Sequence, residues 1–222
     1  MNYFAKFRRF ITAFLMPSLM MLGSLTFSYV VNADQHAKQL QEQQKAPELV
    51  VRDTVDAVIE NIQTNRAVYE QDINALYAML DETLVPALHI PRMSKIILGK
   101  KVAKSSTEEQ KAAFAEEFKT LLMRTYAAAL LEFTGEQKVQ YGDVRYKPSG
   151  DIAVVEGAFI ATDGEKYDII LHMSNRDDTQ WRAYNMEAVG INVISTYRTT
   201  FGPILAKKGI DGLIADLRKK NS

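Results

Sequence analysis

The apolar residues of this 222-residue chain change their spacing at Gly135, and no other feature limits the fold as much. Between Pro47 and Phe133 they recur every three or four residues, which is the spacing of one helix face. After Gly135 they alternate or run on continuously, as they do in β-strands. Because helices come first and strands follow, the sequence predicts an α+β domain.

Several residues mark where the helices begin. Pro47 suits a first helical position, and Asp72 can cap a second helix. Pro86 and Pro91 break the chain that follows into short pieces. A capping box at residues 107–110 then opens a long helix. The apolar stripe of this helix comprises Phe114, Phe118, Leu121, Leu122, Thr125, Tyr126, Ala129 and Phe133.

The second half of the chain predicts a four-stranded antiparallel meander followed by two closing helices. A two-residue hairpin turn at Asp163 and Gly164 joins the second and third strands. The last strand bends at Gly190, continues as a short second strand, and turns at Ser195 into a helix. This helix stops at Gly209, where a second short helix begins. The predicted strands span residues 139–146, 152–162 and 167–173 and the segment that begins at Trp181.

The second predicted strand is apolar on both faces, whereas an antiparallel sheet usually has one wet face. Ile152 and Val154 point to one side, and Ala153, Val155 and Phe159 point to the other. Two explanations remain open: helices cover both sides of the sheet, or one face lines a cavity. The pattern by itself favours a packed core.

The N-terminus has the pattern of a secretory signal peptide over residues 1–33. It contains no acid, and three basic residues near the start precede an uncharged run over residues 10–31. Cleavage is expected after Ala33; the alternative is an uncleaved membrane anchor, because the run is long enough to span about 30 Å. Residues 34–46 are polar and Gln-rich, which predicts a mobile leader, and 47–222 are expected to form one domain.

Composition and motif spacing exclude several functions. The chain has no cysteine, so disulfides, thiolate chemistry and a lipid-modified N-terminus are excluded, and its 27 bases and 27 acids leave no basic excess for nucleic acid. His36, His89 and His172 have no second ligand at metal spacing, so we expect no metal or cofactor. Glu156 could be a buried catalytic acid, but a salt bridge is favoured. Asp177-Asp178 is interpreted as a solvated turn, and no catalytic site is expected.

Two blocks of sequence, taken in order, carry a likeness to a known family. The first is a proline-led helix from Pro91 to Gly99, followed by the Phe, Leu-Leu and Thr-Tyr positions of the long helix. The second is the strand from Trp181 that bends at Gly190 and turns into a helix. Together they resemble the MlaC family, which is also called the toluene-tolerance or Ttg2 family. The family often has Asp-Phe where this chain has Arg92-Met93.

The resemblance implies a soluble, monomeric phospholipid carrier of the periplasm, with lipid as its cargo. Such a carrier moves lipid between an outer-membrane lipoprotein complex containing MlaA and an inner-membrane ABC transporter containing the MCE-domain protein MlaD, and so maintains outer-membrane lipid asymmetry. The implied fold has a strongly bent, NTF2-like sheet with an apolar cavity between the sheet and the helices. The alternatives are an envelope scaffold without lipid cargo and, less favoured, a periplasmic hydrolase.

If the cavity exists, apolar side chains of the sheet and helices should line it. Plain core packing is the competing explanation for each of them. Arg198 could meet a lipid phosphate or form a structural ion pair with Asp168 or Glu187. Lys100, Lys101 and Lys104 form either a solvated helix end or a docking patch. The lining candidates are Phe118, Leu122, Tyr126, Val155, Ile169, Leu171, Met186, Ile191 and Tyr197.

Overall fold

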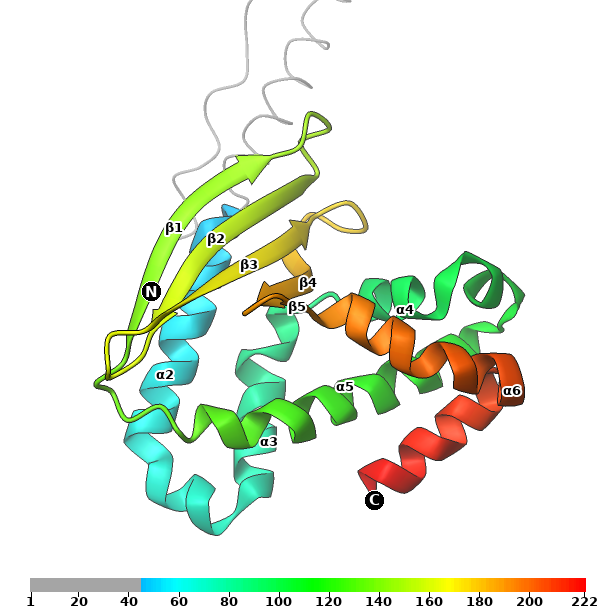
Figure 1. Cartoon of the computed structure of the whole chain (residues 1–222), viewed down its shortest axis with the longest axis horizontal. Coiled ribbons are helices and arrows are strands. Elements are labelled where there is room, and N and C mark those ends of the chain that lie inside the picture. Colours follow the sequence, from blue (N-terminus) through cyan, green and yellow to red (C-terminus); the bar gives the residue numbers. More distant parts are fainter. Residues whose placement is uncertain (1–44) are drawn as a thin grey trace, which may run out of the picture. The chain divides into compact units, whose positions relative to one another are not determined.

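A computed structural model describes residues 45–222 of the chain (Figure 1). The predicted signal peptide, 1–33, and residues 34–44 of the predicted leader lie outside the described residues. The last two leader residues are described: Ala46 is the N-cap of the first helix, and Lys45 pairs with Asp53 inside that helix. In residues 45–222, no helix combines the length and the apolar character that crossing a membrane requires.

Residues 45–222 contain five α-helices and one 3₁₀ turn, and the caps predicted at Asp72 and Thr107 are present. Asp72 accepts a hydrogen bond from the backbone N–H of Asn74. Thr107 and Gln110 form the reciprocal capping box. The elements are α2 (Pro47–Gln71), α3 (Ile73–Thr83), η1 (Val85–Ala87), α4 (Ile90–Ser105), α5 (Glu108–Leu130) and α6 (Val193–Asn221).

Glycines break two of these helices where the sequence indicates a stop. Gly99 interrupts α4 with φ 74° and ψ 160°, and Gly209 interrupts α6 with φ 67° and ψ −173°. Both lie at positive φ, which glycine adopts without a Cβ clash. The break at Gly209 divides α6 into the two closing segments that the sequence predicts.

The sheet has five antiparallel strands in the order β1-β2-β3-β4-β5, so the predicted count of four is wrong, although the short strand expected after Gly190 is present. The chain bends back after Gly190 far enough for Ile191 and Asn192 to pair with Ala188 and Glu187. The predicted two-residue turn is also wrong, because Ala161 pairs with Glu165 around three residues that end in Gly164 at φ 86°. The strands are β1 (Lys138–Tyr146), β2 (Ile152–Ile160), β3 (Lys166–Ser174), β4 (Arg182–Ala188) and β5 (Ile191–Asn192).

Strand register places one apolar row across the middle of the sheet. Val155 of β2 faces Leu171 of β3, which in turn faces Met186 of β4. Directly opposed residues of antiparallel strands project to the same face. This is the face against which Val50 and Val51 of α2 pack, so we call it the inner face.

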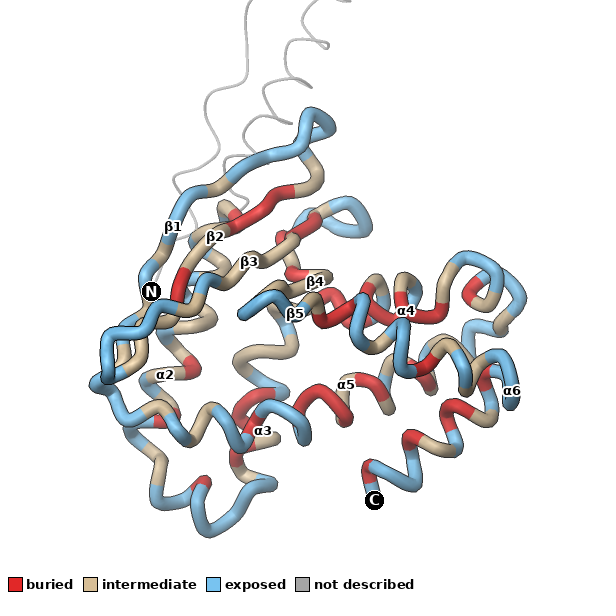
Figure 2. The backbone as a smooth tube through the Cα atoms, viewed as in Figure 1, coloured by how far each residue is buried: buried red, intermediate tan, exposed pale blue. Residues whose placement is uncertain are grey.

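Most of the buried apolar residues form two separate clusters, one in the helices and one in the sheet, and Figure 2 shows buried segments in red. The helix cluster contains residues of all the helices from α2 through α6. At its centre lie Leu76, Phe114 and Leu213, each 0% exposed. The sheet cluster is small and has five buried members: Ala153, Val155, Met173, Trp181 and Ala183.

Candidate functional site

The apolar stripe of α5 runs through two different environments. At its start, Phe114 and Phe118 are 0% exposed and stack with ring centroids 6.0 Å apart. Two turns further on, the stripe continues but Tyr126 is 41% exposed and Ala129 is exposed as well. Figure 2 shows this change along α5 from buried to exposed. An apolar stripe that is not covered by protein marks a place where another apolar group can bind.

The inner face of the sheet has a similar stretch of incompletely covered apolar side chains. Ile169, Leu171 and Met186 are all half-buried, although they sit in the middle of a sheet. Leu171 touches the sheet cluster and Met186 the helix cluster, whereas Ile169 packs against neither among the described residues. These side chains therefore lie between the two cores rather than within one.

Aromatic side chains close both ends of this stretch. At one end, the rings of Tyr146 and Trp181 meet edge to face at 5.9 Å. At the other, Phe133 and Tyr167 lie 6.3 and 6.5 Å from Phe159 between ring centroids. The half-buried row is thus bounded along the strands by two aromatic walls.

Tyr197 of α6 packs against the helix cluster beside α5. Its ring meets Phe118 edge to face, with centroids 5.1 Å apart. Burial raises the pKa of Tyr197 to about 12, the neighbouring Tyr126 adds to the rise, and a hydrogen bond with Thr125 opposes it. The Tyr197 phenol is therefore kept neutral at the junction of α5 and α6.

The predicted lining residues do not all lie in one place. Phe118 and Leu122 are 0% and 5% exposed and belong to the filled helix cluster, and Val155, at 4%, belongs to the sheet cluster. Ile191 lies at the β4–β5 turn and is 57% exposed beside Val189, which has φ 51°. A β-branched residue at positive φ is strained, a feature that the sequence did not predict. The other five lining candidates remain partly exposed: Tyr126, Ile169, Leu171, Met186 and Tyr197.

Arg198 does not form either of the ion pairs considered for it. Asp168 pairs instead with Lys166 at 3.1 Å, and Glu187 with His172 at 2.8 Å. Within residues 45–222, Arg198 takes part in no ion pair. The side chain is exposed and lies beside Gly99 of α4. Its guanidinium is therefore free to meet an external anion.

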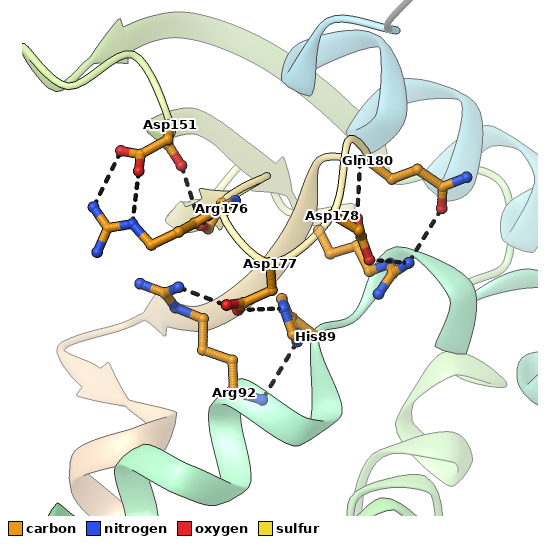
Figure 3. Close-up of polar contacts among 9 residues, drawn as sticks. His89, Arg92, Asp151, Arg176, Asp177, Asp178 and Gln180 are labelled. Carbon is orange, nitrogen blue, oxygen red and sulfur yellow. Dashed lines mark hydrogen bonds and ion pairs between the residues drawn. The ribbon is translucent and has the colours of Figure 1, made fainter.

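A polar cluster ties the β3–β4 loop to the start of α4, as Figure 3 shows. The carboxylate of Asp177 lies 2.9 Å from Nε2 of buried His89 and 3.4 Å from Nη1 of Arg92. Nδ1 of His89 accepts from the backbone N–H of Arg92, and the Arg92 guanidinium lies 4.6 Å from the Tyr184 ring centroid. Asp177 and Asp178 lie in an exposed loop, as the sequence indicates, but both carboxylates are paired, Asp178 with Arg182.

Two acids in or beside β2 are likewise engaged structurally. Asp151 accepts two hydrogen bonds from Arg176, which together with one from Ser149 lower its pKa to about 2. Glu156 forms an ion pair with Arg145, as the sequence favoured. In the part of the chain that is described, no three His, Cys, Asp or Glu side chains form a group that could hold a metal ion.

The sequence and the fold match known proteins over most of the chain. The model of the MlaC protein family matches residues 52–219. The chain belongs to the MlaC family. Among curated MlaC-like relatives, it is 28% identical to the toluene tolerance protein Ttg2D of Pseudomonas putida, over 75% of this chain and 76% of that protein.

A second relative and a solved structure extend the match. The chain is 25% identical to the intermembrane phospholipid transport system binding protein MlaC of Haemophilus influenzae, over 80% of this chain and 83% of that protein. It superposes on a phospholipid-binding protein of Ralstonia solanacearum, solved in complex with a phospholipid, with a TM-score of 0.72 and 25% identity. That alignment covers 80% of this chain and 97% of the other.

Proposed function

We propose that the chain is a soluble phospholipid carrier and that its cargo's acyl chains lie between the inner face of the sheet and the C-terminal half of α5. The observation that carries this proposal is the apolar stripe of α5, which becomes exposed at Tyr126 while Ile169 and Leu171 on the sheet stay half-buried. The phospholipid in the Ralstonia relative and the transport role named for the Haemophilus relative support it.

The energetics of lipid in water explain why a carrier needs an apolar site for its cargo. Two acyl tails of ordinary length expose about 30 methylenes, and each costs about 0.8 kcal/mol in water. The total, on the order of 25 kcal/mol, keeps free phospholipid from crossing an aqueous compartment quickly. A carrier must bury most of that area and still release the lipid, so an open, nonspecific apolar site fits better than a tight one. Little discrimination between headgroups is expected.

The chain would work in the periplasm as a monomer, with residues 47–222 as one lipid-binding domain. It would exchange lipid with an outer-membrane complex containing MlaA and with the MCE-domain protein MlaD of an inner-membrane ABC transporter. Export rests on the signal pattern, which ends at Ala33. N-terminal sequencing of periplasmic material should begin at Asp34, and recovery only in membranes at precursor mass would contradict export.

Lipid extraction tests the carrier function. The protein, purified without detergent from a Gram-negative host, should release phospholipid into organic solvent, and native mass spectrometry should find the same mass bound. Protein that is empty and that also fails to take up lipid from vesicles would favour an envelope scaffold. Turnover of an ester substrate, abolished by a single polar substitution, would favour a hydrolase.

A further inference from the structure

Two neighbouring helical segments carry basic residues and no acid. They are α4, with five bases, and residues 193–208 of α6, with three. The two helices pack side by side, as Figure 1 shows. Nη2 of Arg198 lies 3.8 Å from the point that a Cβ atom would occupy if Gly99 had a side chain. Two of the eight bases are paired: Arg92 with Asp177, and Lys208 with Asp216. The remaining six are exposed, and we call them the basic face: Lys95, Lys100, Lys101, Lys104, Arg198 and Lys207.

The charge of the basic face is local. The chain as a whole has 27 basic and 27 acidic residues, so the face does not follow from a generally basic composition. Two acids at its border are engaged with other cations: Glu108 pairs with Lys111 at 2.8 Å, and Asp216 with Lys208 at 2.7 Å. No member of the basic face takes part in an ion pair among residues 45–222. Its field is therefore directed to solvent.

We propose that the basic face holds the protein against a bilayer surface rich in anionic phospholipid. Five of the six cations are lysines, which are hydrated point charges rather than the bidentate forks that favour one fixed partner. Polybasic segments gain affinity for anionic bilayers from each charge without inserting into them. Contact of this kind is reversible, as loading and release of cargo require.

The composition of the face favours a bilayer over a protein partner. Stable protein interfaces are built around buried aromatic and apolar anchors. In the described part of the chain, none of the exposed large hydrophobic residues lies on α4 or on residues 193–208 of α6. The nearest in sequence, Val189 and Ile191, belong to the β4–β5 turn. A face with charge and no anchor suits a diffuse polyanionic surface.

The position of the face connects it to the lipid site. Arg198 of the face directly follows Tyr197, whose side chain contacts Phe118 and Tyr126 of α5, so one turn of α6 lies beside both the face and the exposed half of the α5 stripe. Docking through this face would bring α6, one wall of the site, next to the headgroup layer. In this respect the inference rests on the proposed carrier function, although bilayer binding itself can be measured without reference to cargo.

Vesicle flotation tests the inference directly. The full chain, purified from a Gram-negative host, should float with vesicles that contain phosphatidylglycerol and not with pure phosphatidylcholine, and salt should weaken binding. The triple variant K100Q/K101Q/K104Q should partition roughly 100-fold less onto the anionic vesicles, at about fivefold for each lysine. Its lipid content and melting temperature should equal those of the wild type.

A matched control separates the face from net charge. Lys138, Lys147 and Lys219 are also exposed and unpaired among the described residues, and they lie outside both segments. The variant K138Q/K147Q/K219Q loses the same charge and should bind anionic vesicles within about threefold of the wild type.

The outcomes are distinct. Equal losses in the two triple variants, or wild-type protein that does not float with anionic vesicles, would overturn the inference. Unchanged vesicle binding of K100Q/K101Q/K104Q, together with slower lipid transfer only when acidic envelope proteins are present, would assign the face to a protein partner instead. Normal flotation by protein that never contains lipid would support bilayer binding but contradict the carrier function.

Discussion

The two halves of α5 present the same apolar stripe to different surroundings. In the first half, Phe114 and Phe118 are fully buried against α6, where the Phe201 ring meets that of Phe114 edge to face at 6.0 Å. In the second half, Tyr126 is 41% exposed. The apolar stripe of α5 therefore continues beyond the part of the helix that other protein side chains cover. Hydrophobic pattern shows that a face is apolar, and packing decides whether protein or ligand covers it.

The two sheet faces differ in a related way. The outer face carries ion pairs, Arg145–Glu156 and Lys166–Asp168, around its apolar centre. The inner face has apolar residues such as Ile169 and Leu171, which are half-buried despite their central position. Together with the second half of α5, the inner face forms the region that we assign to lipid, and the first half of α5 belongs to the folding core.

The largest effect should come from emptying the core half of the stripe. Phe118→Ala removes a ring that is 0% exposed and stacked on Phe114, so it should lower the free energy of unfolding by about 3–5 kcal/mol. Chemical denaturation of the delipidated protein measures this loss. A loss below about 1 kcal/mol would place Phe118 beside empty space and extend the lipid site into the helix cluster.

A charge in the lipid half should remove cargo and spare the fold. Ile169→Asp places a carboxylate where an acyl chain is expected, so the variant should be folded and free of lipid. Leu213→Asp is the matched core substitution, because Leu213 is 0% exposed and an unpaired buried charge costs several kcal/mol. Lipid content and thermal melting are measured on the same samples. If both variants lose the cooperative melt, Ile169 belongs to a packed core.

Truncation in the exposed half of the stripe should be mild for stability. Tyr126→Ala should change the free energy of unfolding by less than about 1 kcal/mol, well below Phe118→Ala on the same helix. It should nevertheless lower the amount of lipid retained, because the ring is expected to cover the acyl chains. Comparable destabilisation by the two substitutions would remove the difference between the halves of α5.

The smallest effect concerns alkaline pH. The folded state holds the pKa of Tyr197 near 12, above the ordinary value of 10, so its contribution to stability is complete below pH 10. Between pH 10 and 12 the unfolded phenol ionises first, and this contribution is lost. Over that range, the denaturation midpoint of the wild type should therefore fall relative to that of Tyr197→Phe. A difference that is constant with pH would indicate that the Tyr197 phenol is solvated.

Much of the fold could be predicted, because its signals are local. The capping box at Thr107, the cap at Asp72 and the helix break at Gly209 depend on residues within a few positions of each other. The short strand after Gly190 was also indicated by the sequence, but the three-residue turn at Gly164 could not be predicted, since the pairing of Ala161 with Glu165 decides its length.

The site was less predictable than the fold. Phe118 and Tyr126 share one stripe and look equivalent in the sequence, but in the fold Phe118 is 0% and Tyr126 41% exposed, and only tertiary packing separates them. The role of Asp177 was missed because its partners, His89 and Arg92, lie far away in the chain. Arg92 is a departure from the family pattern, and its pairing with Asp177 gives that departure a structural use.

Photocrosslinking at two adjacent positions tests the central claim most directly. Ile169 and Ile170 of β3 are both half-buried isoleucines, and because successive strand residues point to opposite faces, only Ile169 faces inward. A photoreactive amino acid is placed at each position in turn, the lipid-loaded protein is irradiated, and its mass is measured. We predict a phospholipid adduct from position 169 and none from position 170. Equal adducts at both positions, or an adduct only from position 170, would contradict the assignment of the inner face to lipid.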